Sequence, residues 1–527
     1  MNVSWDFPYP SQRMPVFARN VVATSHPLAA QAGLQMLQKG GNAVDAAIAT
    51  AITLTVVEPI SNGIGGDAFA LIWDGESLHG LNGSGRSPKK WSYEKFEALG
   101  KMPERGWDTV TVPGAVDVWV TLSDRFGKLP FADLFLPAIN YAHRGFSVPP
   151  MISKRWSNSG ILRDDFEEFA RIFMPQGRAP YPGELFKSPH HAVTLQSIAD
   201  TKGESFYRGE LAEKIAQTAK MDGGSLTLED LGEHASQWVQ PISLEYRGIE
   251  LNEIPPNGQG LASLITLGIL RHHDISRYPV DSADSLHLQI EAMKIAFSEA
   301  HRHIADPDSM IVSPEKLLDD EFLAERAEEI RMDRAMHPQS SIPVDRGTVY
   351  LTAADEGGMM VSYIQSNYMD FGSGVVIPET GINLQCRGRG FVVEKNHPNC
   401  VAGGKRPFHT IIPGFVMKDG NPLMSFGVMG GHMQAQGHVQ MIVRIFDYLQ
   451  NPQAACDAPR WHVGEDFRIA LEPGFPDRVV EELKRRGHIF IEDANVYLFG
   501  GGQLIQRMEN GYCAASDPRK DGQAVGF

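Results

Sequence analysis

The stretch Gly347-Thr348-Val349-Tyr350-Leu351-Thr352-Ala353-Ala354 decides the fold, because a breaker-rich linker becomes a β-strand there. Residues 337–347 are polar and punctuated by prolines, which suits neither helix nor strand, so we expect this linker to be exposed or mobile. Thr348 to Ala354 favour a strand, 355–358 form a turn, and Met359 to Ser366 favour a strand again. The pattern predicts an antiparallel hairpin that begins at Thr348.

Upstream, a cluster of glycines separates two predicted helices. Residues 27–57 read as helices split by Gly40-Gly41-Asn42, and the second is apolar on nearly every face. A helix without a polar face is buried, so we expect this one inside the protein. The glycine-dense loop 61–67 follows, and then a predicted strand from Ala68 to Trp73 with a turn at Asp74-Gly75.

The middle of the chain, about residues 115–335, is predicted to be mainly helical. Runs at 284–304 and 314–332 have the spacing of amphipathic helices. We find no internal repeat and no low-complexity tract, which gives no support to a solenoid or an array. Composition and periodicity therefore predict a mixed α and β protein with an antiparallel hairpin near residue 350.

The composition is that of a globular protein with ample core material. Of 527 residues, 42% are apolar and 21% are charged. The 64 acidic residues outnumber the 48 Lys and Arg residues, which gives a net charge of −16. Because no global basic field exists to attract a phosphate backbone, we expect no nucleic-acid partner.

Targeting and membrane signals favour a cytoplasmic protein. The first ten residues contain neither a basic region nor an apolar core, so no secretory signal is visible. The most apolar stretch, 46–57, is too short to cross a bilayer, and we expect no membrane association. The four cysteines stand singly, which is typical of buried thiols rather than of a disulfide framework or a zinc knuckle.

Four segments together resemble γ-glutamyltransferases in their order and spacing. They are Gly40 to Ala47, Glu58 to Asp67, Gly347-Thr348, and Ala515 to Gly522. The resemblance implies an N-terminal-nucleophile hydrolase, an α+β protein with a four-layer αββα sandwich that is cleaved once. Cleavage would give a large subunit, 1–347, and a small subunit, 348–527. The two would form one catalytic unit, and a dimer of such pairs is left open.

Thr348 is the candidate nucleophile. A threonine hydroxyl needs a base, and its own α-amine, with a pKa of about 7.7 to 8.0, can act as one once it is free. Gly347 admits strained conformations in which the Thr348 hydroxyl can attack the preceding carbonyl, so we expect autocleavage between these residues. Where the family has Thr-Thr-His-x-Ser, this chain has Thr-Val-Tyr-Leu-Thr. Thr352 keeps a hydroxyl on the strand face of Thr348, where it could orient the new amine.

A candidate oxyanion hole lies at Gly430-Gly431, where the family has Pro-Gly-Gly. Paired backbone N–H groups there could stabilise a tetrahedral oxyanion, and glycine permits close approach to a substrate. A Gly-Gly pair by itself is usually a turn, so this role depends on the resemblance. The glycines at 63, 65 and 66 lack the spacing of a dinucleotide fingerprint, and we expect no cofactor.

The expected substrate contacts depart from the family pattern. True γ-glutamyltransferases hold the amine of the glutamyl group with Asp-Asp-Phe, and this chain has Arg387-Gly388-Arg389-Gly390-Phe391. Guanidinium groups repel an amine and favour a planar carboxylate, so Arg387 and Arg389 predict an anionic substrate. The alternative interpretation is that they are solvated loop cations.

Four further residues are candidates for substrate contacts. His409 and Thr410 stand where the family has a Ser-Ser pair that contacts the donor carboxylate. Arg86 lies near the family's substrate-carboxylate arginine, in imperfect register, and Ser366 ends the predicted hairpin. The histidines at 190–191, 272–273 and 301–303 lack metal-ligand spacings and cysteine partners, so we predict no catalytic metal.

These features predict an autoprocessing amidohydrolase that cleaves a small anionic amide through an acyl ester on Thr348. The replaced acidic pair, the length and the missing signal also resemble the oxamate amidohydrolases of this family. A γ-glutamyl transferase or hydrolase and a glutaryl-type acylase are alternatives that need a longer acyl pocket. An unprocessed, non-catalytic binding protein is a further alternative, because the residues after Thr348 differ from the family run.

Overall fold

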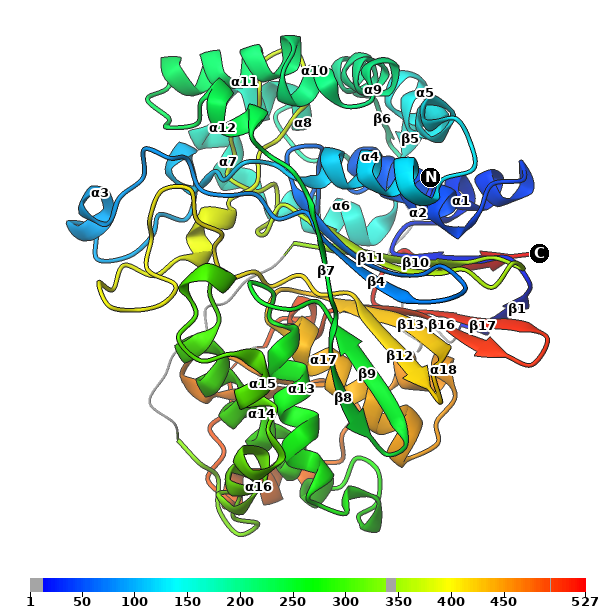
Figure 1. The fold of residues 1–527 in the computed structure, drawn as a ribbon, viewed down its shortest axis with the longest axis vertical. Helices are drawn as coiled ribbons and strands as arrows, with labels where there is room; N and C mark the ends of the chain where they lie inside the picture. Colours follow the sequence, from blue (N-terminus) through cyan, green and yellow to red (C-terminus); the bar gives the residue numbers. More distant parts are fainter. Residues whose placement is uncertain (1–12, 338–346, 493) are drawn as a thin grey trace.

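Two antiparallel sheets lie face to face in the centre of the molecule, and helices cover both outer faces (Figure 1). The computed structural model describes residues 13–337, 347–492 and 494–527. This architecture confirms the predicted α+β fold with a four-layer αββα sandwich. The exposed linker predicted for 337–347 falls largely in 338–346, outside the described residues.

Each central sheet has seven strands within the described part of the chain. The first contains, in spatial order, β18 (Gln523–Gly526), β2 (Val21–Thr24), β10 (Val349–Ala354), β11 (Met360–Ser366), β3 (Asp67–Trp73), β4 (Leu78–Asn82) and β7 (Gln237–Val239). The second contains β1 (Val16–Ala18), β17 (Gly511–Ser516), β16 (Gly501–Met508), β13 (Asn421–Met429), β12 (Gly414–Lys418), β9 (Ile249–Glu253) and β8 (Ile242–Tyr246). Strands from before and after Thr348 pair with one another in both sheets, so neither half of the chain has a sheet of its own.

The outer layers are helical. The layer that shares a core with the first sheet contains α1 (Pro27–Gln38), α2 (Ala43–Val57), α4 (Ala115–Phe126), α5 (Leu136–Arg144), α6 (Pro150–Ser157), α7 (Gly160–Asp165), α8 (Glu167–Phe173), α9 (Pro189–Thr201), α10 (Glu204–Tyr207), α11 (Glu210–Met221) and α12 (Leu228–Gly232). The layer on the second sheet contains α13 (Gly260–Arg271), α14 (Ala283–His303), α15 (Pro314–Leu317), α16 (Asp320–Glu328), α17 (Met433–Ile442), α18 (Pro452–Asp457) and α19 (Asp477–Arg485).

Smaller elements lie around these four layers. They are α3 (Tyr93–Glu97) and the two-stranded pairs β5 (Phe146–Ser147) with β6 (Leu185–Phe186) and β14 (Trp461–Val463) with β15 (Ile469–Leu471). Among the helices of the described residues, none combines the length and the apolar character that a membrane crossing requires.

The glycine break at residues 40–41 separates α1 from α2 as predicted. Helix α2 begins after Asn42, whose side chain accepts the backbone N–H of Asp45, while the Asp45 carboxylate accepts the N–H of Asn42. Every residue of α2 is buried, which confirms the prediction from its apolar faces. The N–H of Ala43 donates to Asp355 Oδ2 over 2.8 Å, so the start of α2 is fixed to the turn of the β10–β11 hairpin.

The hairpin itself separates two cores. Val349, Leu351 and Ala353 face the α2 layer, whereas Tyr350 and Ala354 lie in the core between the sheets. Because side chains alternate along a strand, Thr348 and Thr352 also face the second sheet. The nucleophile candidate therefore stands at the start of β10, inside the sandwich.

Two predicted amphipathic runs differ from the structure. Helix α14 spans the first run as predicted, but it is buried on nearly every turn because it packs against α13, α19 and β14. Its polar residues Ser285, His287, Gln289, Glu291 and Lys294 are buried and hydrogen-bonded inside the protein, whereas Arg302 near its C-terminus is exposed. The second run is divided into α15 and α16, since the Asp319 carboxylate accepts backbone N–H groups and starts a new helix.

A buried ion-pair network fixes the end of β17. Asp517 is fully buried; its carboxylate pairs with Arg460 and Arg519 and accepts the backbone N–H of Gly502 over 2.7 Å. Despite its burial, the two arginines and the N–H donors hold the pKa of Asp517 at about 2.

We predict that Asp517→Asn lowers the free energy of unfolding by about 3–5 kcal/mol, because the buried Arg460 loses its ion-pair partner and Arg519 keeps only Glu472. In the unmodified protein this stabilisation is fully present above about pH 4, the unfolded value, and is lost as the pH falls toward about 2. Denaturant unfolding at several pH values measures both effects. Asp124→Asn, which removes an exposed carboxylate paired with Lys202, is the control, and equal losses in both variants would contradict the prediction.

Candidate active site

Three neighbouring strands of the first sheet bring Thr348, Ser366 and Asp67 together. Ser366 ends β11 and pairs with Asp67, the first residue of β3, while Val349 of β10 pairs with Gln365. The side chains of Ile364 and Phe69, two residues along, lie in the core between the sheets. Since alternate residues share a face, the three polar side chains point into the sandwich at one end of the sheet.

The Thr348 hydroxyl lies against the peptide bond that is predicted to break. Its Oγ1 is 2.7 Å from the carbonyl oxygen of Gly347 and 3.2 Å from Ser366 Oγ. Ser366 Oγ donates to the same carbonyl oxygen over 2.6 Å and accepts the N–H of Tyr368. Gly347 has a φ of +118°, and a Cβ there would come within 2.8 Å of the Met369 backbone, so only glycine fits.

The Gly430-Gly431 turn of the second sheet leads into a helix that contacts Thr348. Gly430 and Gly431 have φ values of +133° and +61° and connect the end of β13 to α17. Gln434, in the first turn of α17, places its Nε2 3.4 Å from Thr348 Oγ1. Gln259 Nε2 donates to the carbonyl of Gly431 over 2.9 Å and holds the turn. The two glutamines were not predicted from the sequence, although Gln434 follows directly on the glycine motif.

Thr352 shares the face of Thr348 but makes its contacts elsewhere. Its Oγ1 donates to the carbonyl of Val361 over 2.9 Å and lies 2.6 Å from Ser425 Oγ on the second sheet. The hydroxyl that contacts Thr348 is that of Ser366, at the end of the neighbouring strand.

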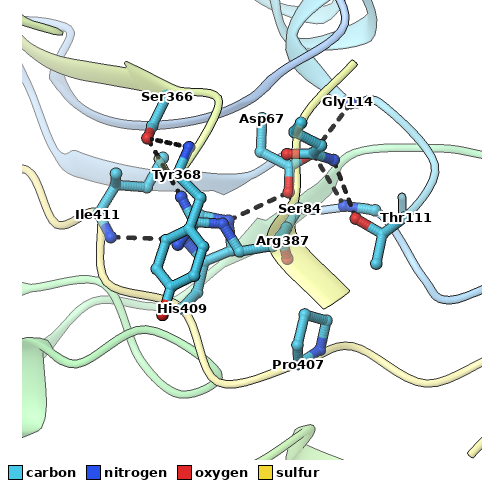
Figure 2. A network of polar contacts seen from close by, with 12 residues as sticks. Asp67, Ser84, Thr111, Gly114, Ser366, Tyr368, Arg387, Pro407, His409 and Ile411 are labelled. Atoms are coloured by element: carbon cyan, nitrogen blue, oxygen red, sulfur yellow. Dashed lines mark hydrogen bonds and ion pairs between the residues drawn. The ribbon is translucent and has the colours of Figure 1, made fainter. Parts of the chain in front are cut away.

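Arg387 contacts the hydroxyl of Ser366, which in turn contacts the candidate nucleophile Thr348. It begins the short 3₁₀ turn Arg387–Gly390 and is fully buried. Its Nη2 donates to Ser366 Oγ over 3.2 Å (Figure 2). Its Nη1 donates to Thr410 Oγ1 over 2.9 Å. The guanidinium carbon is 4.1 Å from the ring centroid of Tyr368, a cation–π contact. We call Thr348, Ser366, Arg387 and Thr410 the acyl site.

Asp67 and His409 form a buried pair beside Arg387 (Figure 2). His409 Nε2 lies 3.1 Å from Asp67 Oδ2, and its Nδ1 accepts the N–H of Ile411 over 3.4 Å. Burial raises the pKa of Asp67 to about 6, and burial together with Arg387 lowers the pKa of His409 well below its ordinary value. No role for Asp67 was predicted from the sequence, although an acid that opens an otherwise apolar strand is a visible signal.

The other two arginines predicted to bind substrate lie outside this cluster. Arg389 is partly exposed; its Nη1 is 3.0 Å from the sulfur of Met369 and its Nη2 3.8 Å from a Glu104 oxygen. Arg86 is 39% exposed, pairs with Asp306 over 2.9 Å, and lines a separate cavity of about 200 Å³. The backbone N–H of Gly85, the residue before Arg86, donates to Asp67 over 3.2 Å, so the loop that carries Arg86 passes beside Asp67 while the Arg86 side chain pairs with Asp306.

A group of potential metal ligands occurs elsewhere in the described residues. It comprises His287 and Glu291 of α14 together with His488, all buried. His287 Nε2 faces the carbonyl of Arg331, and its Nδ1 is 2.8 Å from His488 Nε2. The ammonium of Lys294 donates to Glu291 over 2.8 Å, so a cation already occupies this group. It shares no residue with the acyl site, and the sequence separation of its histidines hid it from spacing arguments.

Comparison with known proteins gives a consistent result. The family model described as gamma-glutamyltranspeptidase matches residues 29–527. A glutathione hydrolase-like YwrD proenzyme of Bacillus subtilis is 37% identical over 97% of this chain and 98% of its own length. An oxamate amidohydrolase proenzyme of Klebsiella pneumoniae is 33% identical over 97% and 99%.

A solved structure extends the similarity to the whole fold. The crystal structure of a cephalosporin acylase from Bacillus halodurans has 47% sequence identity and a TM-score of 0.95, covering 100% of this chain and 99% of that one. The chain therefore belongs to the gamma-glutamyltranspeptidase family and is an autoprocessing amidohydrolase of the proenzyme type.

Proposed function

We propose that the chain cleaves itself between Gly347 and Thr348 and then hydrolyses small amides whose acyl group carries a carboxylate, with oxamate as the leading candidate. The observation that carries the proposal is the buried Arg387 guanidinium, which is hydrogen-bonded to Ser366 beside Thr348. A guanidinium there attracts a carboxylate and repels the amine of a γ-glutamyl group.

In the proposed cleavage step, Thr348 Oγ1 attacks the carbonyl carbon of Gly347, and the proton that the hydroxyl loses passes to the Thr348 nitrogen. The carbonyl oxygen takes up negative charge, which the Ser366 hydroxyl stabilises over its 2.6 Å hydrogen bond and Arg387 stabilises from behind. The C–N bond then breaks, the Thr348 nitrogen leaves as an amine, and an ester remains on Oγ1. Water hydrolyses this ester, which leaves residues 1–347 and 348–527. Because their strands pair in both sheets, the fragments stay together; a dimer of such pairs remains a prediction.

In the proposed catalytic cycle, the free amine of Thr348 accepts the proton of its own hydroxyl. Oγ1 attacks the amide carbon of the substrate, and the N–H groups of Gly430 and Gly431 stabilise the oxyanion. The amine or ammonia leaves with the proton, and water releases the acid from the acyl ester. The orienting role predicted for Thr352 is not favoured, because its hydroxyl is already bonded to Val361 and Ser425.

The substrate carboxylate is proposed to bind Arg387 and Thr410. Of the two arginines that replace the family's acidic pair, only Arg387 contacts a residue of the acyl site among the described contacts. His409 contributes indirectly by pairing with Asp67. Arg86 contacts Asp306 and Arg389 contacts Met369, so we assign neither of them to carboxylate binding.

A longer acyl group is the second candidate. The 47% identity to a cephalosporin acylase favours an acylase with a glutaryl-type substrate, which also carries a carboxylate. A screen of oxamate, a glutaryl amide and γ-glutamyl anilide separates the three activities by acyl length and charge. An uncleaved, inactive chain would leave the binding-protein alternative.

We predict that the purified protein separates under denaturing conditions into fragments of 347 and 180 residues, about 38 and 20 kDa of the total 58.1 kDa. Thr348→Ala should remain one chain, because a methyl group cannot attack the Gly347 carbonyl. Thr348→Ser, the matched control, keeps a hydroxyl and should still be cleaved, more slowly. Intact-mass measurement decides the matter, and a Thr348→Ala variant cut at the same bond would refute the nucleophile.

We predict that Arg387→Gln lowers kcat/KM for oxamate by about 10- to 150-fold, the value of one charge-assisted hydrogen bond of about 1.5 to 3 kcal/mol. For pyruvamide, a neutral analogue with a methyl group in place of one carboxylate oxygen, kcat/KM should fall much less. Arg389→Gln is the control and should change kcat/KM little for either substrate.

The cleaved fraction of each variant is measured first, so that activity is compared per processed enzyme. Equal losses on oxamate and pyruvamide would show that Arg387 does not recognise a carboxylate. If γ-glutamyl anilide is the best substrate of the unmodified enzyme, the proposal of an anionic acyl group fails.

A further inference from the structure

Asp67 is a buried carboxylate that is surrounded by hydrogen-bond donors. Its Oδ1 accepts the backbone N–H of Gly114 over 3.0 Å and of Gly85 over 3.2 Å, and Gln385 Nε2 over 2.9 Å. Its Oδ2 faces His409 Nε2 over 3.1 Å. None of the Asp67 surface is exposed, so these four groups replace water as its solvation.

The hydrogen-bond directions fix the protonation of the pair. Since the N–H of Ile411 points at His409 Nδ1, that nitrogen carries a lone pair. The proton of the neutral imidazole is then on Nε2 and is donated to Asp67. All four neighbours donate, so the resting pair is an ionised carboxylate with a neutral histidine.

This carboxylate balances the charge of Arg387. The guanidinium is fully buried, and a buried cation requires an anion nearby. Asp67 supplies it, because the Asp67–His409 pair lies next to the guanidinium. His409 contacts Asp67 over 3.1 Å, and the next residue, Thr410, accepts a hydrogen bond from Arg387 over 2.9 Å. The charge of Arg387 correspondingly lowers the pKa of Asp67 against the effect of burial. A substrate carboxylate that enters the acyl site would put a second anion beside the same guanidinium, and the two anions would compete for it.

We propose that Asp67 is a specificity-determining residue: its charge sets how strongly the acyl site binds a carboxylate, and one proton taken up by the Asp67–His409 pair converts the site to its anion-binding form. The proposal rests on the proposed function, in which the acyl group is anionic. Whichever residue carries the added proton, His409 Nδ1 then bears a hydrogen, so proton uptake gives up the long 3.4 Å contact with the Ile411 N–H.

The surrounding groups determine the sign of the pH dependence. They are Arg387 on the 3₁₀ turn, His409 and Arg406 before β12, and Tyr207 on α10, whose pKa is raised by burial and nearby acids. The pKa of Asp67 in the free site is about 6, and a bound carboxylate raises it further because like charges repel. Binding of an anion therefore strengthens as the pH falls toward 6 and levels off below it, by at most about tenfold per pH unit for one proton.

The test compares two substrates of equal carbon-chain length and different charge, glutaryl p-nitroanilide and valeryl p-nitroanilide, with oxamate and pyruvamide as a shorter pair. The ratio of kcat/KM within a pair cancels the titration of the Thr348 amine, which affects both substrates alike. In the unmodified enzyme the ratio of anionic to neutral substrate should rise between pH 8 and pH 6 and then stay constant. Asp67→Asn should give a ratio that does not change with pH and that is at least as high at pH 8 as the unmodified enzyme reaches at pH 6.

The matched control is Asp306→Asn, which removes another buried carboxylate near arginines, Arg86 and Arg406, but outside the acyl site. It should keep the pH dependence of the unmodified enzyme. The proposal is overturned if the ratio in the unmodified enzyme is flat from pH 5.5 to 8.5, a measurement that does not depend on the folding of any variant. The proposal is also overturned if the processed Asp67→Asn variant shows the same change of this ratio with pH as the unmodified enzyme.

The two proposals fail in different ways. If neither anionic substrate is preferred over its neutral partner at any pH, the proposed function is wrong. If an anionic substrate is preferred but the preference does not respond to pH or to Asp67, the function stands and Asp67 has only a structural role.

Discussion

The pairing of three strands, β10, β11 and β3, is the constraint on which the site depends. Their register places Ser366 opposite Asp67 and sets Thr348 beside both, and the alternation of the strands turns all three side chains toward the second sheet. A slip of one residue in any of these strands would move its polar group into the helical layer, among apolar side chains. The register is held by residues on both faces, with Leu351 and Tyr363 in the outer core and Tyr350 and Ile364 in the inner one.

Charge in the site is organised around one buried guanidinium. Arg387 reaches Ser366 and Thr410 directly, and Asp67 with His409 supplies the balancing anion. A buried arginine without such a partner would destabilise the fold. Because Asp67 already balances the Arg387 guanidinium, an anionic substrate would have to compete with the Asp67 carboxylate. In our proposal, the acid on β3 would both stabilise the fold and limit the affinity for anions, because the two effects arise from the same carboxylate.

Local sequence signals predicted much of the fold. They predicted little of the site, because the site depends on contacts between residues that are far apart in the sequence. The break at Gly40-Gly41, the buried α2 and the hairpin after Thr348 depend on neighbours in sequence, and they were found within a residue or two. The four layers required the family resemblance. Asp67, Gln434 and the choice of Arg387 over Arg389 depend on which strands become neighbours, and no local pattern contains that information. The pairing of Arg86 with Asp306 likewise depends on a residue 220 positions away, which no local pattern reveals.

The uncleaved chain already uses the groups that the proposed substrate would use. Ser366 donates to the Gly347 carbonyl, and Arg387 donates to Ser366, so the bond before Thr348 lies where an amide substrate would later bind. Glycine is required at position 347, because the positive φ and the close approach to the Met369 backbone leave no room for a side chain. Under the proposed function, Arg387 would act in both maturation and substrate binding, whereas the oxyanion would be held by Ser366 in the first and by the Gly430 and Gly431 N–H groups in the second. A substitution at Arg387 acts on both, and its effect on substrate choice is defined only for the fraction of the protein that has been cleaved.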